Sequence, residues 1–251
     1  MSQPTGPRDW DAATYDRISD PQFTWACEQL ERLELAGDEV VLDAGCGTGR
    51  VTELLVERVA RGRVYGVDSS ESMVRHARGA LGKRAVVLHQ DLLELSLPEP
   101  VDAVFSNATF HWVHDHDALF ASLRRVMKPG ARLVAQCGGA GNIEAFRRAA
   151  ASVASEEPFD AFFAAWQEPW NYAGEEETAT RLHRAGFSRV DIWSEPKRVQ
   201  PARTFLETVC LLPYLKLLPG DLGRVFVDRV LKRACEPVVL DYMRLNMMAR
   251  A

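Results

Sequence analysis

A glycine-rich turn between an apolar run and a helical pattern constrains this chain more than any other feature. The run 40–42 predicts a buried strand, Asp43 ends it, and a helical pattern begins near Val51. Three glycines form the turn between them: Gly45, Gly47 and Gly49. Such a turn places free backbone N–H groups beside the positive end of a helix dipole, and glycine lets a ligand approach closely because no Cβ intervenes. The pattern therefore predicts a nucleotide-like ligand at the start of the helix.

The spacing of the glycines narrows the class of ligand that the turn can bind. A dinucleotide-binding turn, G-x-G-x-x-G, would need a glycine at position 50, where this chain has Arg50; its third glycine is Gly49. Asp43 would repel a pyrophosphate but suits a ligand whose near end carries an ammonium group, such as S-adenosylmethionine (SAM). With its lead-in 41–44, the turn resembles the first motif of class I SAM-dependent methyltransferases. Within it we interpret Cys46 as a small filler rather than a nucleophile.

A second apolar run, 63–68, ends on an acid about 20 residues past the glycine turn, the spacing at which a carboxylate meets ribose hydroxyls. We therefore expect Asp68, with the adjacent Ser69, at the ribose. Ser70 supplies a helix start, and Met73 is placed to cover an adenine face with its flexible thioether. The alternatives are an Asp68 that caps a loop and a Met73 that belongs to the core.

Residues 85–91, 101–106 and 131–136 predict three further strands. In the class I family the acid that ends the third strand accepts from the adenine amine, and the next N–H meets the ring; by that resemblance these are Asp91 and Leu92. Five strands alternating with helices imply a parallel, doubly wound sheet, whose ligands lie outside the carboxyl ends of its strands. The candidate contacts at those ends are Asp43, Asp68, Asp91 and Asn107.

The rest of the chain completes one expected domain, residues 1–251. We expect an α/β fold with a doubly wound, mostly parallel seven-stranded sheet, whose last strand, 238–246, is antiparallel at the sheet edge. The sheet core takes about 38–138, 174–200 and 237–250. Three segments outside it, rich in aromatic side chains, predict a helical lid that excludes water, or alternatively a satellite core. They are about 1–37, 139–173 and 201–236.

The segment Ser106–Val113 is the best guide to the substrate. With His111 and Trp112 it resembles the fourth motif of the trans-aconitate methyltransferases and related small-molecule carboxyl methyltransferases, and the resemblance extends over nearly the whole chain. It implies O-methylation of a carboxylate. The chain departs from the group at Leu212, where a basic residue is expected, and this favours a substrate less charged than a tricarboxylate. The expected substrate contacts are Trp112, Tyr15, Trp170 and Tyr214.

The chemistry of the acceptor decides whether a base is needed. SAM already carries an activated methyl group, so an ionised carboxylate needs only to be positioned, whereas a hydroxyl, an amine or an acidic carbon must lose a proton. His111 is the candidate base and the candidate catalytic residue; the alternative is a buried, hydrogen-bonded histidine. We expect no metal site at His111, His114 and His116, because a strand end and a helix start do not share one face, and Asp115 or Asp117 suits a helix N-cap.

Composition limits the alternatives. A formal net charge of −5 with scattered arginines argues against a nucleic-acid substrate, and the apolar runs are too short to cross a membrane. Five cysteines without a C-x-x-C pair suggest a reducing cytoplasm, so we expect a cytoplasmic monomer or homodimer acting on a small molecule. Two other classes remain: a nicotinamide-dependent oxidoreductase, disfavoured by Arg50 and Asp43, and a SAM-binding protein that transfers no methyl group.

Overall fold

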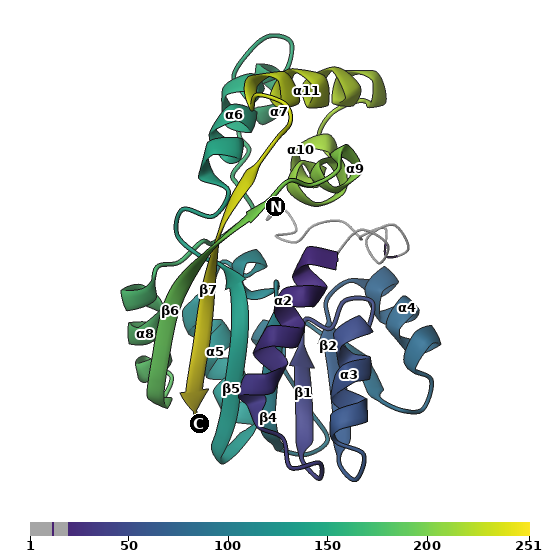
Figure 1. Cartoon of the computed structure of the whole chain (residues 1–251), viewed down its shortest axis with the longest axis vertical. Helices are drawn as coiled ribbons and strands as arrows, with labels where there is room; N and C mark the ends of the chain where they lie inside the picture. Colours follow the sequence, from purple (N-terminus) through teal and green to yellow (C-terminus); the bar gives the residue numbers. More distant parts are fainter. Residues whose placement is uncertain (1–11, 13–19) are drawn as a thin grey trace.

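The computed structural model describes residues 12 and 20–251, whose strands form one seven-stranded sheet in the order β3-β2-β1-β4-β5-β7-β6 (Figure 1). β7 is antiparallel to both of its neighbours, and the β3-β2-β1-β4-β5 pairs are parallel. The α/β fold with a doubly wound, mostly parallel sheet is thus confirmed. The strands are β1 (Val40–Ala44), β2 (Arg63–Asp68), β3 (Val86–His89), β4 (Val101–Asn107), β5 (Met127–Gly138), β6 (Ser188–Val199) and β7 (Leu240–Arg250).

The position of the last strand differs from the expectation. β7 is antiparallel, as expected, but the edge placement is wrong, since β7 lies between β5 and β6. Its side chains explain this, because Leu245, Met247 and Ala249 are buried. β6 forms the edge instead. Its partly exposed Glu195 and Lys197 suit a sheet edge, where charged side chains discourage pairing with another chain.

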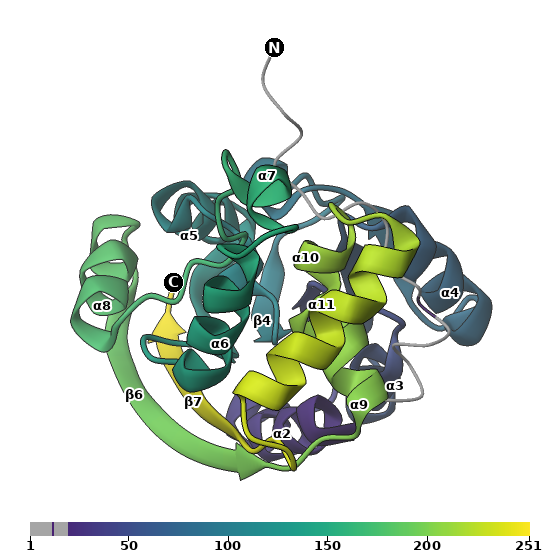
Figure 2. The same cartoon turned by 90° about the horizontal axis from the view of Figure 1, so that it is seen from above.

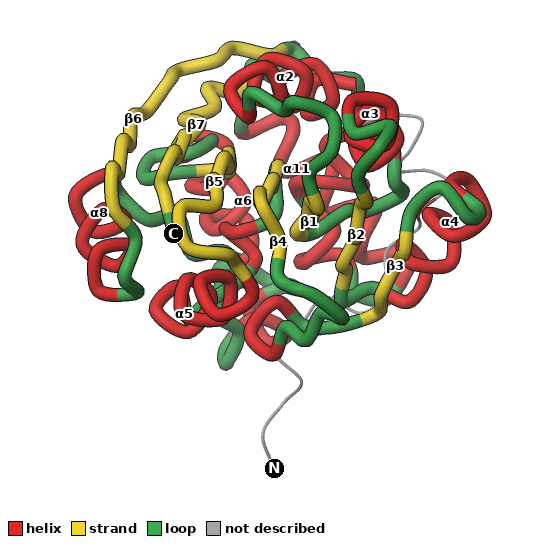
Figure 3. Tube along the Cα trace, turned by 90° about the horizontal axis from the view of Figure 1, so that it is seen from below, coloured by secondary structure: helices red, strands yellow, loops and turns green. Residues whose placement is uncertain are grey.

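Helices cover both faces of the sheet (Figure 3). On one face α2, α3 and α4 pack against residues such as Val41 and Phe105; on the other, α5 and α8 pack against residues such as Leu42 and Val104. Neighbouring strand residues alternate between the faces. The bounds are α2 (Asp20–Leu30) with the 3₁₀ turn η1 (Glu31–Leu33), α3 (Arg50–Arg58), α4 (Glu71–Leu81), the 3₁₀ turns η2 (Leu92–Glu94) and η3 (Phe110–Trp112), α5 (His116–Val126) and α8 (Glu175–Arg184).

Two of the helix starts follow directly from the sequence. The Ser70 hydroxyl accepts from the backbone N–H of Met73 and caps α4, and the Asp115 carboxylate accepts from the N–H of Ala118 and caps α5. Both caps were expected from the residue types. They fix the loops that follow β2 and β4, which are the loops at the carboxyl end of the sheet.

A second layer of helices lies above that end of the sheet and forms the lid (Figures 1 and 2). These helices have a hydrophobic core of their own, which includes Phe159, Phe226 and Leu231. The lid and the satellite core, which were alternatives in the sequence, are therefore formed by the same helices. Pro213 and Pro219 interrupt the helical pattern by standing at helix starts. The lid helices are α6 (Glu144–Ala154), α7 (Asp160–Phe163), α9 (Arg203–Phe205), the π-helical turn η4 (Leu206–Cys210), α10 (Leu212–Leu215) and α11 (Gly220–Arg233).

Helix α2 belongs mainly to the sheet rather than to the lid. It falls in the segment 1–37 that we assigned to the lid, yet Ala26 and Leu30 pack against Val41 and its neighbours on the sheet. Trp25 is the exception, because it joins the lid core and contacts the Tyr242 ring at 5.1 Å. None of the helices in the described part of the chain combines the length and apolar character that crossing a membrane requires.

Candidate active site

The segments that follow the carboxyl ends of β1 to β5, together with the underside of the lid, line one large cavity of about 1030 Å³. We call its two parts the turn end and the lid end. Most residues that the sequence analysis singled out line it, which is the convergence that a doubly wound sheet predicts. The turn end includes Gly45, Gly47, Asp68, Ser69, Met73, Asp91, Leu92 and Asn107, and the lid end includes His111, Trp112, Asn142, Ile143, Trp170, Tyr172, Val209, Cys210, Tyr242 and Arg244.

The glycine turn depends on glycine at two positions in particular. Gly45 has φ +83°, and a Cβ there would lie 2.1 Å from Oγ1 of Thr109. Gly49 has φ +93° and packs against Ala77 and Leu81 of α4, so it seats α3 beside α4 and does not line the cavity. Cys46 is buried in the turn, and burial raises the pKa of its thiol well above the usual value, which fits a filler.

Asp68 holds the loops of the turn end together. Its two carboxylate oxygens accept from the N–H groups of Gly47 and Ser70, each at 2.9 Å. Burial raises the pKa of the carboxyl group above its ordinary value, and these two backbone donors oppose the shift. Asp68 therefore caps a loop and also lines the cavity, with lone pairs left for a further donor.

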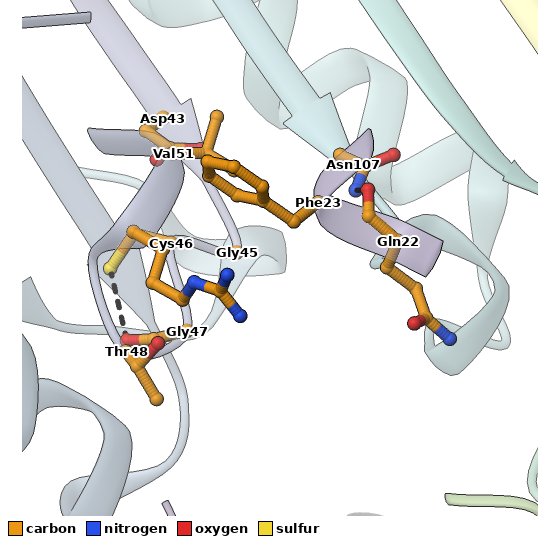
Figure 4. Close-up of a pocket in the computed structure, with 10 residues that line it drawn as sticks. Gln22, Phe23, Asp43, Gly45, Cys46, Gly47, Thr48, Val51 and Asn107 are labelled. Atoms are coloured by element: carbon orange, nitrogen blue, oxygen red, sulfur yellow. Dashed lines mark hydrogen bonds between the residues drawn. The ribbon is translucent and has the colours of Figure 1, made fainter. Parts of the chain in front are cut away.

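Asp43 lies beneath the turn. Its carboxylate accepts from the Thr52 hydroxyl at 2.6 Å, and the side chain is 2% exposed. Burial, with a contribution from Asp68, raises its pKa to about 7. Asp43 is thus bound to the first turn of α3. The same residue also borders the small pocket at the glycine turn that Figure 4 shows.

Two amide oxygens at the turn end have no hydrogen-bond partner among the described residues. They are Oε1 of Gln22 and Oδ1 of Asn107, both buried. The Asn107 amide is oriented by its Nδ2, which donates to the Gln22 carbonyl at 3.0 Å. Both residues line the cavity beside Gly45 (Figure 4). A buried acceptor without a donor marks a place where a ligand can supply one. We predicted a role for Asn107 but missed Gln22, whose one signal was its place in the N-terminal segment 1–37.

The far side of the turn end is built from residues of α4 and η2. Met73 is buried and lines the cavity, and Leu92 is buried beside it. Asp91 is exposed and caps η2 by accepting from the N–H of Leu93 at 2.9 Å. A thioether, an apolar side chain and a carboxylate around one space form a suitable surface for a flat base with an exocyclic amine.

His111 is a buried, neutral imidazole at the start of the lid end. The N–H of Gly138 donates to its Nδ1 at 3.3 Å, so the proton of the neutral ring lies on Nε2. Burial holds the pKa of the ring well below its usual value, and the positive charge of Arg244 adds to this. The ring stacks on Tyr172 with centroids 5.6 Å apart. Nε2–H therefore remains as a hydrogen-bond donor.

Aromatic rings surround His111, and they separate the expected substrate contacts into two groups. Trp112 and Trp170 line the cavity and contact each other at 5.7 Å. Tyr214 instead packs into the lid core, 4.4 Å from the Trp166 ring, and does not line the cavity. Its expected contact with the substrate is not seen, because an aromatic run has the same pattern in a lid core and in a cavity wall. Tyr15 lies outside the described residues.

Arg244 was missed by the sequence analysis. It is 2% exposed and lines the lid end, where its Nε donates to Oε1 of Gln136 at 3.2 Å. Its guanidinium lies 4.9 Å from the centre of the Trp25 ring. The signal was an arginine in the interior of the last strand. The departure at Leu212 concerns the first residue of the lid helix α10, which does not line the cavity.

The three neighbouring histidines do not converge. The His116 ring nitrogen Nε2 contacts the Phe110 carbonyl at 3.0 Å, whereas His114 is exposed at the cavity rim and His111 is bound to Gly138. Within residues 12 and 20–251 no group of three or more histidine, cysteine or acidic side chains has the geometry of a metal site.

Comparisons with known proteins agree with this geometry. A family model described as a methyltransferase domain matches residues 42–135. A trans-aconitate 2-methyltransferase of Acidovorax is 30% identical over 241 residues, which cover 91% of this chain and 90% of the relative. One from Methylobacterium nodulans is 36% identical over 187 residues, covering 74% of this chain and 67% of the relative.

Solved structures show the same fold at low identity. The YcgJ protein from Bacillus subtilis has a TM-score of 0.65 at 12% identity, with 90% of this chain and 97% of that chain covered. Phosphoethanolamine N-methyltransferase 2 from Haemonchus contortus, in complex with S-adenosyl-L-methionine, has a TM-score of 0.57 at 19% identity, with 91% of this chain and 52% of that chain covered.

Proposed function

This chain belongs to the class I SAM-dependent methyltransferases, in the group of the trans-aconitate 2-methyltransferases, and on that premise we propose that it transfers a methyl group to the carboxylate of a small molecule. Its relatives carry a name that implies carboxylate methylation. The observation that carries the proposal for this chain is the hydrogen bond from the Gly138 N–H to Nδ1 of His111, because it favours the Nε2–H form of the ring, which is a donor rather than a base.

The turn end fits SAM. The unpartnered oxygens of Gln22 and Asn107 suit the α-ammonium group, in place of the role that we first gave to Asp43 alone. Asp68, whose carboxylate can accept further hydrogen bonds beside those from its backbone donors, suits the ribose hydroxyls. Asp91, with Leu92 and Met73, suits the adenine. Gly45, Gly47 and Cys46 would line the space beside the methionine part.

A carboxylate acceptor matches the protonation of the lid end. When bound, SAM would supply a methyl group already activated by its sulfonium. A carboxylate oxygen would take that methyl group, and the electron pair of the methyl–sulfur bond would stay on sulfur. No proton leaves the acceptor in this reaction. His111, neutral and protonated on Nε2, can donate to a carboxylate oxygen but cannot take a proton at that nitrogen.

The remaining residues position the acceptor and exclude water. Trp112, Trp170 and Tyr172 close the lid end around His111, and the ring contacts between them fix their orientation. A water-poor cavity strengthens every hydrogen bond to a bound anion. Holding the acceptor at the right place is the main task that the chain performs.

The test is the chemical stability of the methylated product. Purified protein would be incubated with methyl-labelled SAM and a panel of small carboxylic acids, phenols and amines. We expect label in a methyl ester, which strong alkali hydrolyses to volatile methanol. Transfer of label only into an alkali-stable ether, amine or C-methyl product would contradict the proposal and would point to an acceptor that must lose a proton.

A further inference from the structure

Arg244 lines the lid end of the cavity. The residue is buried, and among its contacts are a hydrogen bond to a neutral amide, Oε1 of Gln136, and the face of the Trp25 ring. Its charge lowers the pKa of His111 and opposes the burial that raises the pKa of the Tyr172 phenol, so its field reaches both rings. Arginine carries a planar fork of donors that matches a carboxylate and is less strongly hydrated than lysine, which favours it in a buried anion site.

Arg244 and His111 are held against the same point of the sheet. Arg244 on β7 is the register partner of Gly138, the last residue of β5. The N–H of Gly138 donates to Nδ1 of His111. Both residues are thus tied to one backbone position, and both line the cavity, to which they bring two kinds of donor, a guanidinium and an imidazole N–H. A Cβ at Gly138 would lie 2.5 Å from the Tyr172 ring, so the rings there are closely packed.

We propose that Arg244 and His111 together hold one carboxylate of the acceptor, and that the substrates of this chain are monocarboxylic acids with an apolar or aromatic body rather than di- or tricarboxylates. This inference rests on the proposed function, because it concerns the carboxylate that is methylated. Each of the two groups donates to that carboxylate, and the oxygen that attacks keeps a free lone pair.

The lining of the cavity argues for a single charge on the substrate. Arg244 is the one lysine or arginine among the described residues that line the cavity. The other charged lining residues are acids, and they would repel further carboxylates: Asp68, Asp91 and Asp115. Ile143, Trp112 and Val209 offer apolar surface instead. A second carboxylate buried there without a cation would carry a large desolvation cost.

The experiment measures acceptor binding apart from turnover. Calorimetry of the full chain saturated with S-adenosylhomocysteine would compare 3-phenylpropionate, octanoate, the neutral 3-phenylpropionamide and propane-1,2,3-tricarboxylate. The variants are R244M, R244K and R244Q, of which R244Q retains a donor for Gln136. The control is R250M, on the same strand but at its other end, where Arg250 contacts the Gly130 carbonyl.

We expect the wild type and R250M to bind the monocarboxylates at least tenfold more tightly than the tricarboxylate. R244M and R244Q should weaken monocarboxylate binding at least tenfold and leave amide and S-adenosylhomocysteine binding unchanged. The monocarboxylate affinity of R244K should lie between that of the wild type and that of R244M. Unchanged monocarboxylate affinity in folded R244M and R244Q, tighter binding of the tricarboxylate, or no binding of either monocarboxylate would overturn the inference. If these binding results overturn the inference but the methylated product is alkali-labile, the proposed carboxylate methylation still stands. If the product is alkali-stable, both the proposed function and the inference fall.

Discussion

The hydroxyl of Thr52 donates to Oδ2 of Asp43 at 2.6 Å and joins the end of β1 to the first turn of α3. The pair lies under the glycine turn, where Asp43 is 2% exposed. Burial raises the pKa of Asp43 to about 7, Asp68 adds to the shift, and the Thr52 hydroxyl opposes it. Ionisation of the Asp43 carboxyl group therefore destabilises the folded, ligand-free protein.

The first prediction is a pH-dependent stability difference between the wild type and Asp43→Asn. Because the pKa is higher in the folded than in the unfolded chain, the folded protein binds more protons between about 4 and about 7, and its free energy of unfolding falls as pH rises through that window. Asn cannot ionise and can still accept from Thr52. In thermal unfolding without ligand, the melting temperature of D43N should rise relative to that of the wild type as the pH is raised from 5 to 8. A constant difference, like that expected for the exposed control Asp117→Asn, would count against the buried carboxylate.

The second prediction concerns Asp68. Asp68→Ala should weaken SAM binding tenfold or more, because charge-assisted hydrogen bonds of about 1.5–3 kcal/mol would be lost. Since Asp68 also binds the N–H groups of Gly47 and Ser70, Asp68→Asn serves as a milder variant that keeps one acceptor. Calorimetry gives the affinity, with Asp117→Ala as the control. Unchanged SAM affinity in a folded variant would remove the ribose assignment.

The third prediction tests the two unpartnered amide oxygens. Gln22→Leu should weaken SAM binding about tenfold, because an acceptor for the ammonium group would be lost. Gln29 is a matched control on the same helix, since its Oε1 is also buried without a partner among the described residues but does not line the cavity. Gln29→Leu should leave SAM affinity as it is. Equal affinities for the two variants would show that Gln22 does not meet the ligand.

The fourth prediction compares two glycines. Gly45→Ala should abolish SAM binding and lower the melting temperature, since its Cβ would overlap the Thr109 side chain at a positive φ. Gly79 lies inside α4, where a Cβ would meet nothing within 4 Å, so Gly79→Ala should raise stability by up to about 1 kcal/mol and leave SAM binding intact. Thermal shift with and without SAM measures both. A G45A variant that binds SAM normally would contradict the account of the turn.

Features set by neighbouring residues could be predicted from the sequence. The apolar runs indicated all seven strands, the sixth of them at residues 189–193. Ser70 was recognised as a helix cap and Asp115 as one of two candidates, because capping needs only local residues. The place of β7 inside the sheet could not be predicted, since chain order does not determine strand order.

The parts of the site that depend on long-range contacts were also missed. Arg244 meets Gly138 only after β7 has paired with β5, and the arginine alone does not indicate that partner. Tyr214 could not be assigned to the lid core or to the cavity wall, because both surround aromatic rings with apolar residues. Gln22 became a candidate only when its Oε1 was found buried without a partner among the described residues and the residue was found to line the cavity.

The central claim is that the acceptor needs no base and that His111 acts only as a donor. Its most direct test is kcat against pH, from pH 6 to pH 9, at saturating SAM and acceptor for the wild type and His111→Gln, which retains an N–H donor. We predict flat profiles for both, with kcat of the variant within about tenfold of the wild type and the larger change in KM. A rising limb in the wild type that disappears in His111→Gln, together with a kcat loss of about 10²–10⁴-fold, would contradict the account.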